Sequence, residues 1–401
     1  MISSLRVALF TDSFQEANGV ATLSQQFAAF TARQHIPFLC VHSGTRTQVT
    51  SHQSLTTIEL KRSLAAFPLD FDLRCDPLLS RHKNWVMDQL RLFRADLVHI
   101  TGPGDIGILG FWVAHSLGIP LVASWHTNLH QYAGRRLDQL FSRLPRSWRN
   151  RIACKGEDLT LSALLRFYRL PRFLMAPNES TIHLLSERTR KPTFFMRHGV
   201  DTDVFSPARR GPRTKAFCIG YVGRLTPEKN LRLFAGLERS LLAAGQRDFR
   251  LLLIGEGREK EWLKNNVRSA ELPGVLRGKA LAEAFSGMDV FVFPSRTDTF
   301  GLVLLEAMAS GVPVVVSPEA GIRVGVEHRV SGFLAEELQS VTQSVLQLME
   351  DEALRSEMSR GARRFACSQS WSGVFEQVYR TYESGLEECG LLMPSLGRSK
   401  A

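Results

Sequence analysis

The sequence has 401 residues, of which 44% are hydrophobic and 22% are charged, and this length suits two domains of ordinary size. No run of 18 or more apolar residues is free of charge, so we expect no membrane-spanning helix. The six cysteines are scattered, without a CxxC pair or a metal-ligand spacing. We therefore expect no cysteine-bound metal and a reducing, cytoplasmic environment.

The net charge of +11 is unevenly distributed along the chain. Residues 1–200 carry 24 Lys and Arg against 14 Asp and Glu, whereas residues 201–401 carry 26 against 25. The basic surplus thus belongs to the first half. A polyanion or an anionic membrane surface is the natural partner of such a surplus.

Apolar runs that alternate with helical segments predict a parallel α/β domain over residues 1–197. The first strand is expected at Leu5 to Thr11, and a helix from about Ala21 to Gln34 follows a loop that contains Gly19. Gly19 could let a backbone approach a ligand closely, although a plain strand-to-helix turn is the alternative. Further strands are expected at residues 38–41, 56–60, 96–101, 120–124, 173–176 and 193–197.

Residues 102–107 have the glycine spacing GxGxxG between a predicted strand and a predicted helix. A dinucleotide-binding loop of this kind also requires an acid about 20 residues further on. The next strand is followed instead by His126, without an acid, so a nicotinamide or flavin site is disfavoured. His126 should lie at the carboxyl edge of the sheet, where its ring can bind an anion or a sugar hydroxyl. A loop histidine without a role is the alternative.

A basic segment covers residues 134–155. Leu137, Leu140, Phe141 and Leu144 have helical spacing, and Pro145 begins a second helical piece. The surrounding cations are Arg135, Arg136, Arg143, Arg146, Arg149, Arg151 and Lys155. A cationic amphipathic helix with an aromatic residue, here Trp148, suits an anionic lipid interface. A helix with merely solvated arginines is the alternative, and nucleic acid is disfavoured because no recognised binding module accompanies the segment.

Residues 198–214 are polar and are expected to link the first domain to a second α/β domain over residues 215–370. The linker contains Asp201 and Asp203, which resemble the DxD pair that holds a metal in some sugar transferases. Asp70 and Asp72 have the same spacing, so metal binding is disfavoured. Residues 371–390 predict an amphipathic helix that packs back on the first domain, and residues 391–401 a flexible tail.

Two cations follow the first strand of the second domain, which ends at Val222. Arg224 and Lys229 lie in a loop that begins with Gly223 and should occupy the carboxyl edge of the sheet. Arginine can bind a pyrophosphate with a fork of donors and lysine as a point charge. Solvated loop charges are the alternative.

The stretch 292–317 predicts a strand, a polar loop with Asp298, a helix that opens at Gly301, and another strand. The first amides of that helix suit an anion. Glu306 interrupts an apolar helix, so we expect it to face a polar partner. A helical rise would place Asp298 and Glu306 roughly 12 Å apart, farther than the about 5–9.5 Å typical of glycosidase acids. This spacing favours two carboxylates that hold opposite ends of an elongated ligand; a capping residue and a surface acid are the alternatives.

Six motifs in this order resemble those of the retaining glycosyltransferases of family four, whose GT-B fold has two Rossmann-like parallel-sheet domains facing a cleft. The resemblance covers nearly the whole chain. The motifs are TDSFQEANGVATL, SWHTNLHQYA, HGVDTDVFSP, YVGRLTPEKN, LIGEG and VFPSRTDTFGLVLLEAMASGVPVV.

The resemblance implies a retaining hexosyltransferase that uses a nucleotide diphosphate sugar and needs no metal or other cofactor. Arg224 and Lys229 would bind the diphosphate, Glu306 the ribose, and Asp298 the sugar hydroxyls. Gly19 and His126 would reach the phosphate and sugar from the first domain when the cleft closes. The expected catalytic set is His126, Arg224, Lys229 and Asp298. The expected donor-binding set is Gly19, Arg224, Lys229, Asp298, Phe300, Gly301, Leu302 and Glu306.

Two positions depart from the common pattern: Asp298 stands where many members have Glu, and Asn128 where close relatives often have Asp. The first two motifs are most similar to the branch that glycosylates membrane lipids. We therefore expect a UDP- or GDP-hexose donor and a lipid or polyprenyl-linked glycan acceptor, handled by a cytoplasmic protein peripheral to the inner membrane face. A soluble transferase acting on a small sugar or polysaccharide, a nucleotide-sugar epimerase and a non-catalytic binder are the alternatives.

Overall fold

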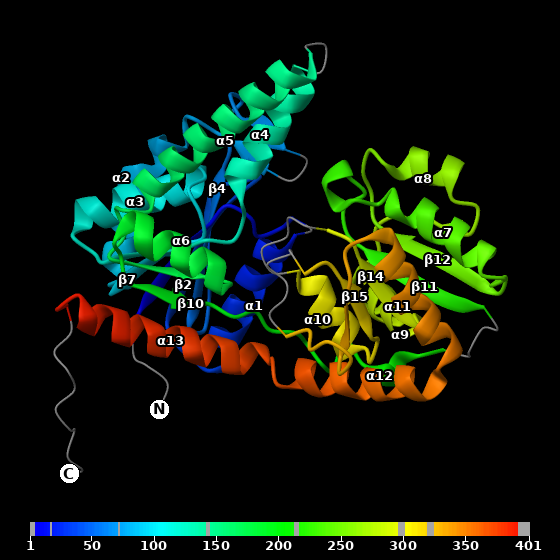
Figure 1. Ribbon diagram of the computed structural model, residues 1–401. Helices are drawn as coiled ribbons and strands as arrows, with labels where there is room; N and C mark the ends of the chain where they lie inside the picture. Colours follow the sequence, from blue (N-terminus) through cyan, green and yellow to red (C-terminus); the bar gives the residue numbers. More distant parts are fainter. Residues whose placement is uncertain are drawn as a thin grey trace, which may run out of the picture. The chain divides into compact units, whose positions relative to one another are not determined.

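The structure is a computed structural model that describes residues 5–16, 18–70, 73–141, 145–211, 216–295, 301–318 and 325–391. The chain forms two compact units, residues 1–197 with 372–401 and residues 198–371 (Figure 1). Each unit has its own largely parallel sheet and its own hydrophobic core. The predicted class of two Rossmann-like α/β domains is confirmed.

The sheet of the first unit has the strand order β10-β9-β8-β7-β1-β2-β4-β3. All neighbours pair in parallel except β3 and β4. The central strands are buried along their whole length, as expected of a parallel sheet that is covered on both faces. The strands are β1 (Val7–Thr11), β2 (Phe38–Gly44), β3 (Gln48–His52), β4 (Leu55–Lys61), β7 (Leu97–Ile100), β8 (Leu121–Ser124), β9 (Phe173–Ala176) and β10 (Thr193–Phe195).

The segment between the predicted strands at residues 38–41 and 56–60 is polar and is typical of a loop, so the strand β3 was not predicted. All five of its residues are exposed. The strand has no buried face, so its sequence lacks the alternation of apolar and polar residues that indicates a half-buried strand. Its antiparallel pairing with β4, in which Val49 faces Ile58, makes it an edge strand. A separate two-stranded ribbon consists of β5 (Phe67–Asp70) and β6 (Leu73–Cys75).

The last helix of the chain, α13, packs on the first unit. The rings of Phe27 on α1 and Phe375 on α13 stack with centroids 4.4 Å apart, and both side chains are fully buried. Helix α1 begins at Gly19. The side chain of the preceding residue, Asn18, accepts a hydrogen bond from the amide of Ala21 and caps the helix. The helices of this unit are α1 (Gly19–Arg33), the short 3₁₀ helix η1 (Leu79–His82), α2 (Lys83–Phe93), α3 (Asp105–Leu117), α4 (Leu129–Leu140), α5 (Arg146–Phe167), α6 (Glu179–Thr189) and α13 (Trp371–Glu388).

The second unit contains an all-parallel sheet with the order β13-β12-β11-β14-β15-β16. Its strands are β11 (Phe217–Val222), β12 (Phe249–Ile254), β13 (Ala270–Glu271), β14 (Val290–Phe293), β15 (Val314–Val316) and β16 (Gly332–Leu334). Its helices are η2 (Pro207–Arg209), η3 (Pro227–Lys229), α7 (Leu233–Ala243), α8 (Lys260–Asn266), α9 (Gly278–Ser286), α10 (Leu302–Ala309), α11 (Leu338–Glu350) and α12 (Glu352–Cys367).

The sequence predicts a helical region over residues 339–364, and the structure divides it into two helices, α11 and α12. Asp351 separates them in an extended conformation, and its carboxylate accepts a hydrogen bond of 2.8 Å from the amide of Leu354. Aspartate favours this capping position because its side chain satisfies an amide at the helix start. The apolar periodicity continues through both helices and therefore did not mark the break.

Candidate functional site

The carboxyl edge of the second sheet brings together most of the predicted site residues that the structure describes. Strands β11 and β14 are direct neighbours. Arg224 and Lys229 follow β11, whereas Gly301, Leu302 and Glu306 belong to the segment that follows β14. The loops of neighbouring parallel strands meet at the same edge of a sheet, which is where such folds bind ligands.

Lys229 is 5% exposed, which is unusual for a lysine. Its ammonium nitrogen lies 6.0 Å from the centre of the Phe293 ring, so it sits beside the end of β14. Arg224 is partly exposed, and its guanidinium lies 3.8 Å from the carboxylate of Glu228. The backbone of Arg224 is fixed by the Tyr221 hydroxyl, which donates a 3.0 Å hydrogen bond to the Arg224 carbonyl oxygen. Two cations therefore follow β11 at this edge of the sheet, close to the ends of β11 and β14.

The loops that follow β11 and β12 are packed against each other through glycines. A Cβ atom on Gly255 would lie 1.9 Å from the carbonyl oxygen of Gly223, and one on Gly257 would lie 2.2 Å from that of Leu225. The Leu225 amide also donates a 2.8 Å hydrogen bond to the carbonyl oxygen of Glu256. These contacts fix the course of the chain that carries Arg224.

Helix α10 begins with Gly301 as its N-cap residue. Gly301 has φ +70°, a left-handed conformation that favours glycine, and no side chain of the described residues caps the helix. The first amides of a helix have no partner within the helix. Gly301 and Leu302 thus present the start of α10 at the carboxyl edge of the sheet, in keeping with the anion site that the sequence predicted.

Glu306 lies on α10 and is partly buried. Removal of its carboxyl group from water raises its pKa from the ordinary value of 4.5 to about 7. The polar partner that we expected for Glu306 is not among the residues that the structure describes. A desolvated carboxyl group without such a partner is suited to accept hydrogen bonds from a ligand.

Two further predicted residues, Asp298 and Phe300, lie outside the described residues. In the sequence they stand between the end of β14 and Gly301. Their assignments to the sugar and to the donor site therefore stay predictions.

In the first unit, Gly19 and His126 both lie at the carboxyl edge of the sheet. Gly19 is the first residue of α1 and is exposed, whereas His126 comes two residues after the end of β8 and is 8% exposed. The His126 Nε2 atom lies 2.6 Å from the hydroxyl of Ser124. Burial lowers the pKa of His126 to about 4, so its ring is neutral at pH 7.

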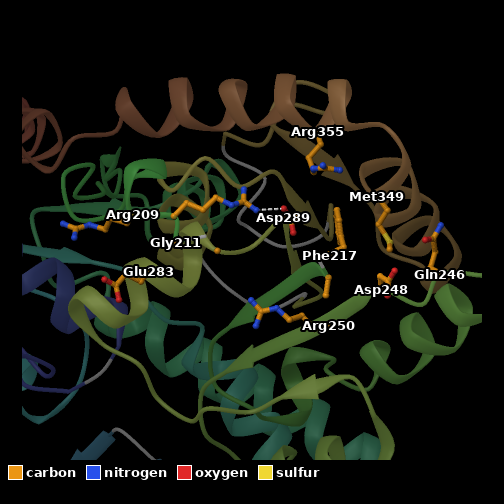
Figure 2. A pocket seen from close by; sticks show the side chains of 13 residues that line it. Arg209, Gly211, Phe217, Gln246, Asp248, Arg250, Glu283, Asp289, Met349 and Arg355 are labelled. Carbon is orange, nitrogen blue, oxygen red and sulfur yellow. Dashed lines mark hydrogen bonds and ion pairs between the residues drawn. The ribbon is translucent and has the colours of Figure 1, made fainter. Parts of the chain in front are cut away.

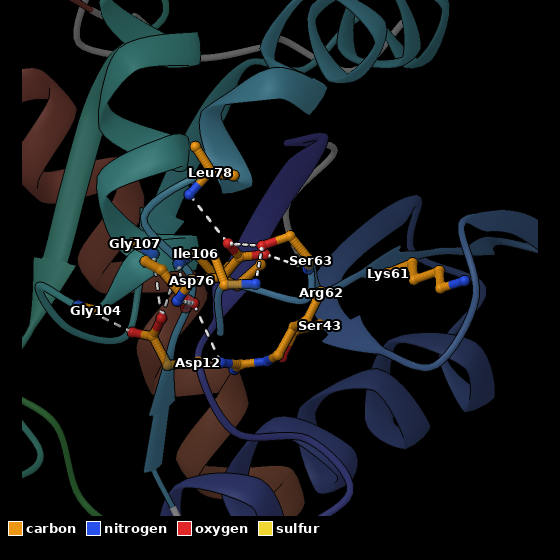
Figure 3. A network of polar contacts seen from close by, with 12 residues as sticks. Asp12, Ser43, Lys61, Arg62, Ser63, Asp76, Leu78, Gly104, Ile106 and Gly107 are labelled. Atoms are coloured by element: carbon orange, nitrogen blue, oxygen red, sulfur yellow. Dashed lines mark hydrogen bonds and ion pairs between the residues drawn. The ribbon is translucent and has the colours of Figure 1, made fainter. Parts of the chain in front are cut away.

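The glycine-rich loop 102–107 is filled by a side chain of the protein itself. Asp12, which follows β1, accepts hydrogen bonds from the amides of Gly104 at 3.2 Å and Ile106 at 2.9 Å, at the start of α3 (Figure 3). A Cβ atom on Gly104 would lie 2.4 Å from the Asp12 carboxyl group. This helix start already holds a carboxyl group of the protein itself, which argues against a dinucleotide phosphate there.

The carboxyl groups of Asp12 and Asp105 lie close together at the start of α3. Burial and the negative charge of Asp105 raise the pKa of Asp12 to about 7, although hydrogen bonds from the amides of Ile106 and Gly107 oppose the shift. Arg62 lies 3.2 Å from the Asp105 carboxylate and offsets its charge. Asp12 was not singled out from the sequence, because its amide partners lie more than 90 positions away in the chain.

The DxD pair of the linker has a local structural role. The Asp201 carboxylate accepts hydrogen bonds from the amides of Asp203 at 3.1 Å and Val204 at 3.0 Å, which form a turn. Asp72 and the side chain of Asp70 lie outside the described part of the chain. Within that part, no three His, Cys, Asp or Glu side chains are grouped so that they could hold a metal ion.

A cavity of about 590 Å³ lies at the opposite, amino edge of the second sheet, where β11 begins with Phe217 and β14 follows Asp289 (Figure 2). Two of its arginines already have acidic partners: Arg210 pairs with Asp289, and Arg250 lies 2.8 Å from Glu271. Because parallel α/β sheets bind ligands at their carboxyl edge, we do not assign this cavity to the predicted site.

The basic segment forms the helices α4 and α5, which pack side by side (Figure 1). A Cβ atom on Gly156 would lie 2.0 Å from Leu137, so Leu137 packs against α5 and does not face outward. Leu140 is 75% exposed and Trp148 is 63% exposed. The predicted apolar stripe is therefore divided between the helix contact and the surface. Among the described residues, no helix is both long and apolar enough to cross a membrane.

The two units, each with a largely parallel sheet covered by helices, have the architecture of the GT-B fold. Residues 17–204 match the family described as Glycosyltransferase Family 4, and residues 205–365 match that described as Glycosyl transferases group 1. The chain belongs to glycosyltransferase family 4 and is a glycosyltransferase. The resemblance found in the sequence motifs is thus confirmed.

Curated relatives and solved structures agree with this placement. A GDP-mannose-dependent alpha-mannosyltransferase of Mycolicibacterium smegmatis is 30% identical over 312 residues, which cover 74% of this chain and 76% of that protein. A sulfoquinovosyl transferase of Arabidopsis thaliana is 28% identical over 312 residues, which cover 73% and 57%. The fold is similar to that of a sucrose-phosphate synthase from Thermosynechococcus elongatus, with a TM-score of 0.68 and 18% identity over 96% of this chain and 100% of the other.

Proposed function

We propose that this protein transfers a hexosyl group from a nucleotide diphosphate sugar to a hydroxyl acceptor, with retention of configuration and without a metal ion. One observation carries the proposal. The loop with Arg224 and Lys229 and the helix start with Gly301 and Glu306 follow neighbouring strands at the carboxyl edge of the second sheet. Cations, helix amides and an available carboxyl group are the groups that bind a diphosphate and a ribose.

Each predicted site residue of the second unit has a role in this proposal. Arg224 and Lys229 offset the negative charge of the diphosphate, and the amides at the start of α10 donate hydrogen bonds to its oxygens. Glu306 accepts hydrogen bonds from the ribose hydroxyls. Asp298 contacts the sugar hydroxyls and Phe300 belongs to the donor site; these two assignments come from the family motif.

His126 and Gly19 of the first unit are assigned to the sugar and phosphate of the donor. During transfer, the bond between the sugar C1 and the phosphate oxygen breaks, and the acceptor oxygen bonds to C1 on the same face. The acceptor proton passes to the departing phosphate oxygen. The charge that develops on the diphosphate is offset by Arg224 and Lys229, which take the part that a divalent cation has in other transferases.

GDP-mannose is the first donor to test, because a relative at 30% identity is named for its dependence on it. A thermal-shift panel of GDP, UDP and ADP with their common sugar conjugates identifies the base. A ligand at 100 times its dissociation constant should stabilise the protein by about 2.7 kcal/mol. We expect one base to stabilise the protein. If none does, the donor proposal is contradicted.

Lys229→Ala tests the assignment of the diphosphate site. We expect it to abolish sugar transfer and the thermal shift given by the nucleotide diphosphate. Lys279→Ala, on the exposed surface of α9, is the matched control and should retain both. Full activity of Lys229→Ala would contradict the site, and epimer formation or binding without turnover would favour an epimerase or a non-catalytic binder.

For the acceptor, we propose a lipid or a polyprenyl-linked glycan at the inner membrane face. The support is the surface of α4 and α5, where Leu140, Trp148 and Leu159 are 63–75% exposed. The cations Arg136, Arg151 and Lys155 are exposed on the same pair of helices. Apolar side chains beside cations are the composition that binds an anionic lipid interface.

Co-sedimentation with vesicles tests the acceptor proposal. We expect binding to vesicles with anionic lipid that weakens as salt is raised, and no binding to neutral vesicles. Trp148→Ala should reduce the binding. Leu92→Ala, at a 77% exposed position on α2, is the control and should not. Absence of salt-sensitive binding would favour a soluble transferase.

A further inference from the structure

Two helices of the first unit begin at the carboxyl edge of its sheet, after neighbouring strands. Strands β1 and β7 pair directly, α1 follows β1, and α3 follows β7. The first amides of a helix have no partner within the helix, so either start could hold an anionic group. The two starts differ in what the chain itself places there.

The start of α3 is closed by Asp12, the residue that directly follows β1. Its carboxyl group accepts hydrogen bonds from the amides of Gly104 at 3.2 Å, Ile106 at 2.9 Å and Gly107 at 3.4 Å (Figure 3). A Cβ atom on Gly107 would lie 1.8 Å from the carbonyl oxygen of Gly102, so this loop has no room for a side chain there. The glycine-rich loop is thus shaped around a carboxyl group of the protein.

The start of α1 keeps two amides open. The Asn18 side chain accepts a hydrogen bond from the amide of Ala21, and the Asn18 carbonyl oxygen accepts one from the amide of Thr22. Among the described residues, none accepts a hydrogen bond from the amide of Gly19 or of Val20. These two amides are therefore available to the anionic oxygens of a ligand.

Ser13 joins Asp12 to the start of α1. It is 7% exposed, and its carbonyl oxygen accepts a 2.8 Å hydrogen bond from the hydroxyl of Thr11. The Ser13 hydroxyl accepts a 3.2 Å hydrogen bond from the side-chain amide of Asn18. Because Asn18 directly precedes Gly19, the contacts of Asp12 and Ser13 constrain the turn that carries the open amides.

We propose that Asp12 is a positioning residue: by occupying the start of α3 it fixes the chain after β1 and holds the open amides of Gly19 and Val20 in place for the diphosphate of the donor. This inference rests on the proposed role of Gly19 in binding the donor phosphate. Asp12 acts through the loop and does not contact the donor. Its carboxyl group also takes the place of an anion at α3, which leaves α1 as the helix start that receives the phosphate.

The alternative is a purely structural carboxyl group, which would stabilise the fold without an effect on the turn at Gly19. The chain contains such a group for comparison. Glu59 on β4 is 9% exposed and accepts hydrogen bonds from the amides of Thr45 at 2.6 Å and Arg46 at 3.1 Å, in a different loop of the same sheet. Glu59→Ala is therefore the matched control for Asp12→Ala.

Two substitutions of Asp12 separate its hydrogen bonds from its charge. Asp12→Ala removes the acceptor at the start of α3. Asp12→Asn keeps a side-chain oxygen that can accept from Ile106 and Gly107, and its amide group can donate to Asp105, as a protonated Asp12 does. The readouts are hydrogen exchange of the full chain, measured by mass spectrometry on peptides that cover residues 13–24, and kcat/KM for sugar transfer. The Tm of each variant reports its loss of stability.

We expect Asp12→Ala to exchange faster than the wild-type protein in residues 13–24. Its kcat/KM should be lower by about tenfold or more, with a raised KM for the donor, because an amide hydrogen bond to a charged oxygen is weakened. Asp12→Asn should resemble the wild-type protein in both readouts. Glu59→Ala should lose stability and keep the wild-type exchange of residues 13–24 and the wild-type kcat/KM.

Ser13→Ala serves if Asp12→Ala does not fold. It leaves Asp12 in place and removes the hydrogen bond to Asn18, so exchange near Gly19 should again be faster. Unchanged exchange of residues 13–24 in Asp12→Ala, or in Ser13→Ala where the former does not fold, would overturn the proposal. Losses in Asp12→Asn as large as those in Asp12→Ala would overturn its basis in hydrogen bonds.

Equal effects of Glu59→Ala and Asp12→Ala on exchange and on kcat/KM would reduce Asp12 to a structural role. Faster exchange with a constant kcat/KM would overturn the role of Gly19 in donor binding, and with it the positioning role of Asp12. Hydrogen exchange is measured equally well on a protein that transfers no sugar. Failure of the proposed function is thus distinguishable from failure of this inference.

Discussion

Replacement of Glu306 by glutamine should stabilise the protein at alkaline pH and at the same time weaken donor binding. The side chain keeps its size, while the charge that burial opposes is removed. In the folded state burial raises the pKa of Glu306 from 4.5 to about 7. A carboxyl group with a raised pKa contributes stability below its unfolded value, and this contribution is lost as the pH rises through the folded value.

The size of the effect follows from the pKa values. A shift of one pKa unit corresponds to about 1.4 kcal/mol. Ionisation of Glu306 above pH 7 therefore lowers the free energy of unfolding by at most roughly 3 kcal/mol. Below pH 4.5 the glutamate is neutral and the two proteins should be equally stable. The advantage of Glu306→Gln should therefore grow between pH 4.5 and 7. At pH 8 its Tm should be higher by about 5–10 °C at most.

The assay is thermal unfolding of the two proteins from pH 4 to pH 8, with titration of the donor nucleotide at pH 7.5. Glu357→Gln, at an exposed position on α12, is the control and should show no such pH-dependent gain. Donor affinity of Glu306→Gln should fall about tenfold or more, because a hydrogen bond to a charged group is lost. A difference in Tm that does not change with pH would refute the desolvation argument, and unchanged affinity would refute the ribose assignment.

Three further predictions concern packing and chemistry. Gly257→Ala should destabilise the second unit by about 1–3 kcal/mol in denaturant unfolding, since its Cβ would lie 2.2 Å from the Leu225 carbonyl oxygen; Gly211→Ala, with nothing within 4 Å, should be nearly neutral. Phe375→Ala should cost about 3–5 kcal/mol, because it empties the stack with Phe27; a smaller loss than 1 kcal/mol would contradict the packing of α13. Sugar transfer should persist after treatment with EDTA, and its loss with recovery on adding a divalent cation would contradict metal independence.

The strands and helices near the proposed site were predictable because their patterns are local. The buried runs of β1, β7, β8 and β14 lie between helical segments, and each run fixes a strand without reference to the rest of the chain. The order of the six motifs identified the family for the same reason. The exposed edge strand β3 and the break at Asp351 escaped prediction, because neither changes the apolar periodicity on which the prediction relied.

The sequence alone determined that Arg224, Lys229, Gly301 and Glu306 follow strands of one parallel sheet. Whether a carboxyl group is desolvated depends on neighbours that come from other segments, so only the tertiary structure shows the raised pKa of Glu306.

The same distinction holds in the first unit, where the decisive contacts join residues far apart in the chain. Asp12 fills a helix start about 90 positions away, and Tyr382 meets His99 across 283 positions. No local pattern records such a pair, because it exists only once β1, β7 and β8 are neighbours and α13 has packed against them. The sequence therefore determined which chemical groups the site contains, and the fold decided the protonation state of Glu306 and the hydrogen-bonding partners of His126.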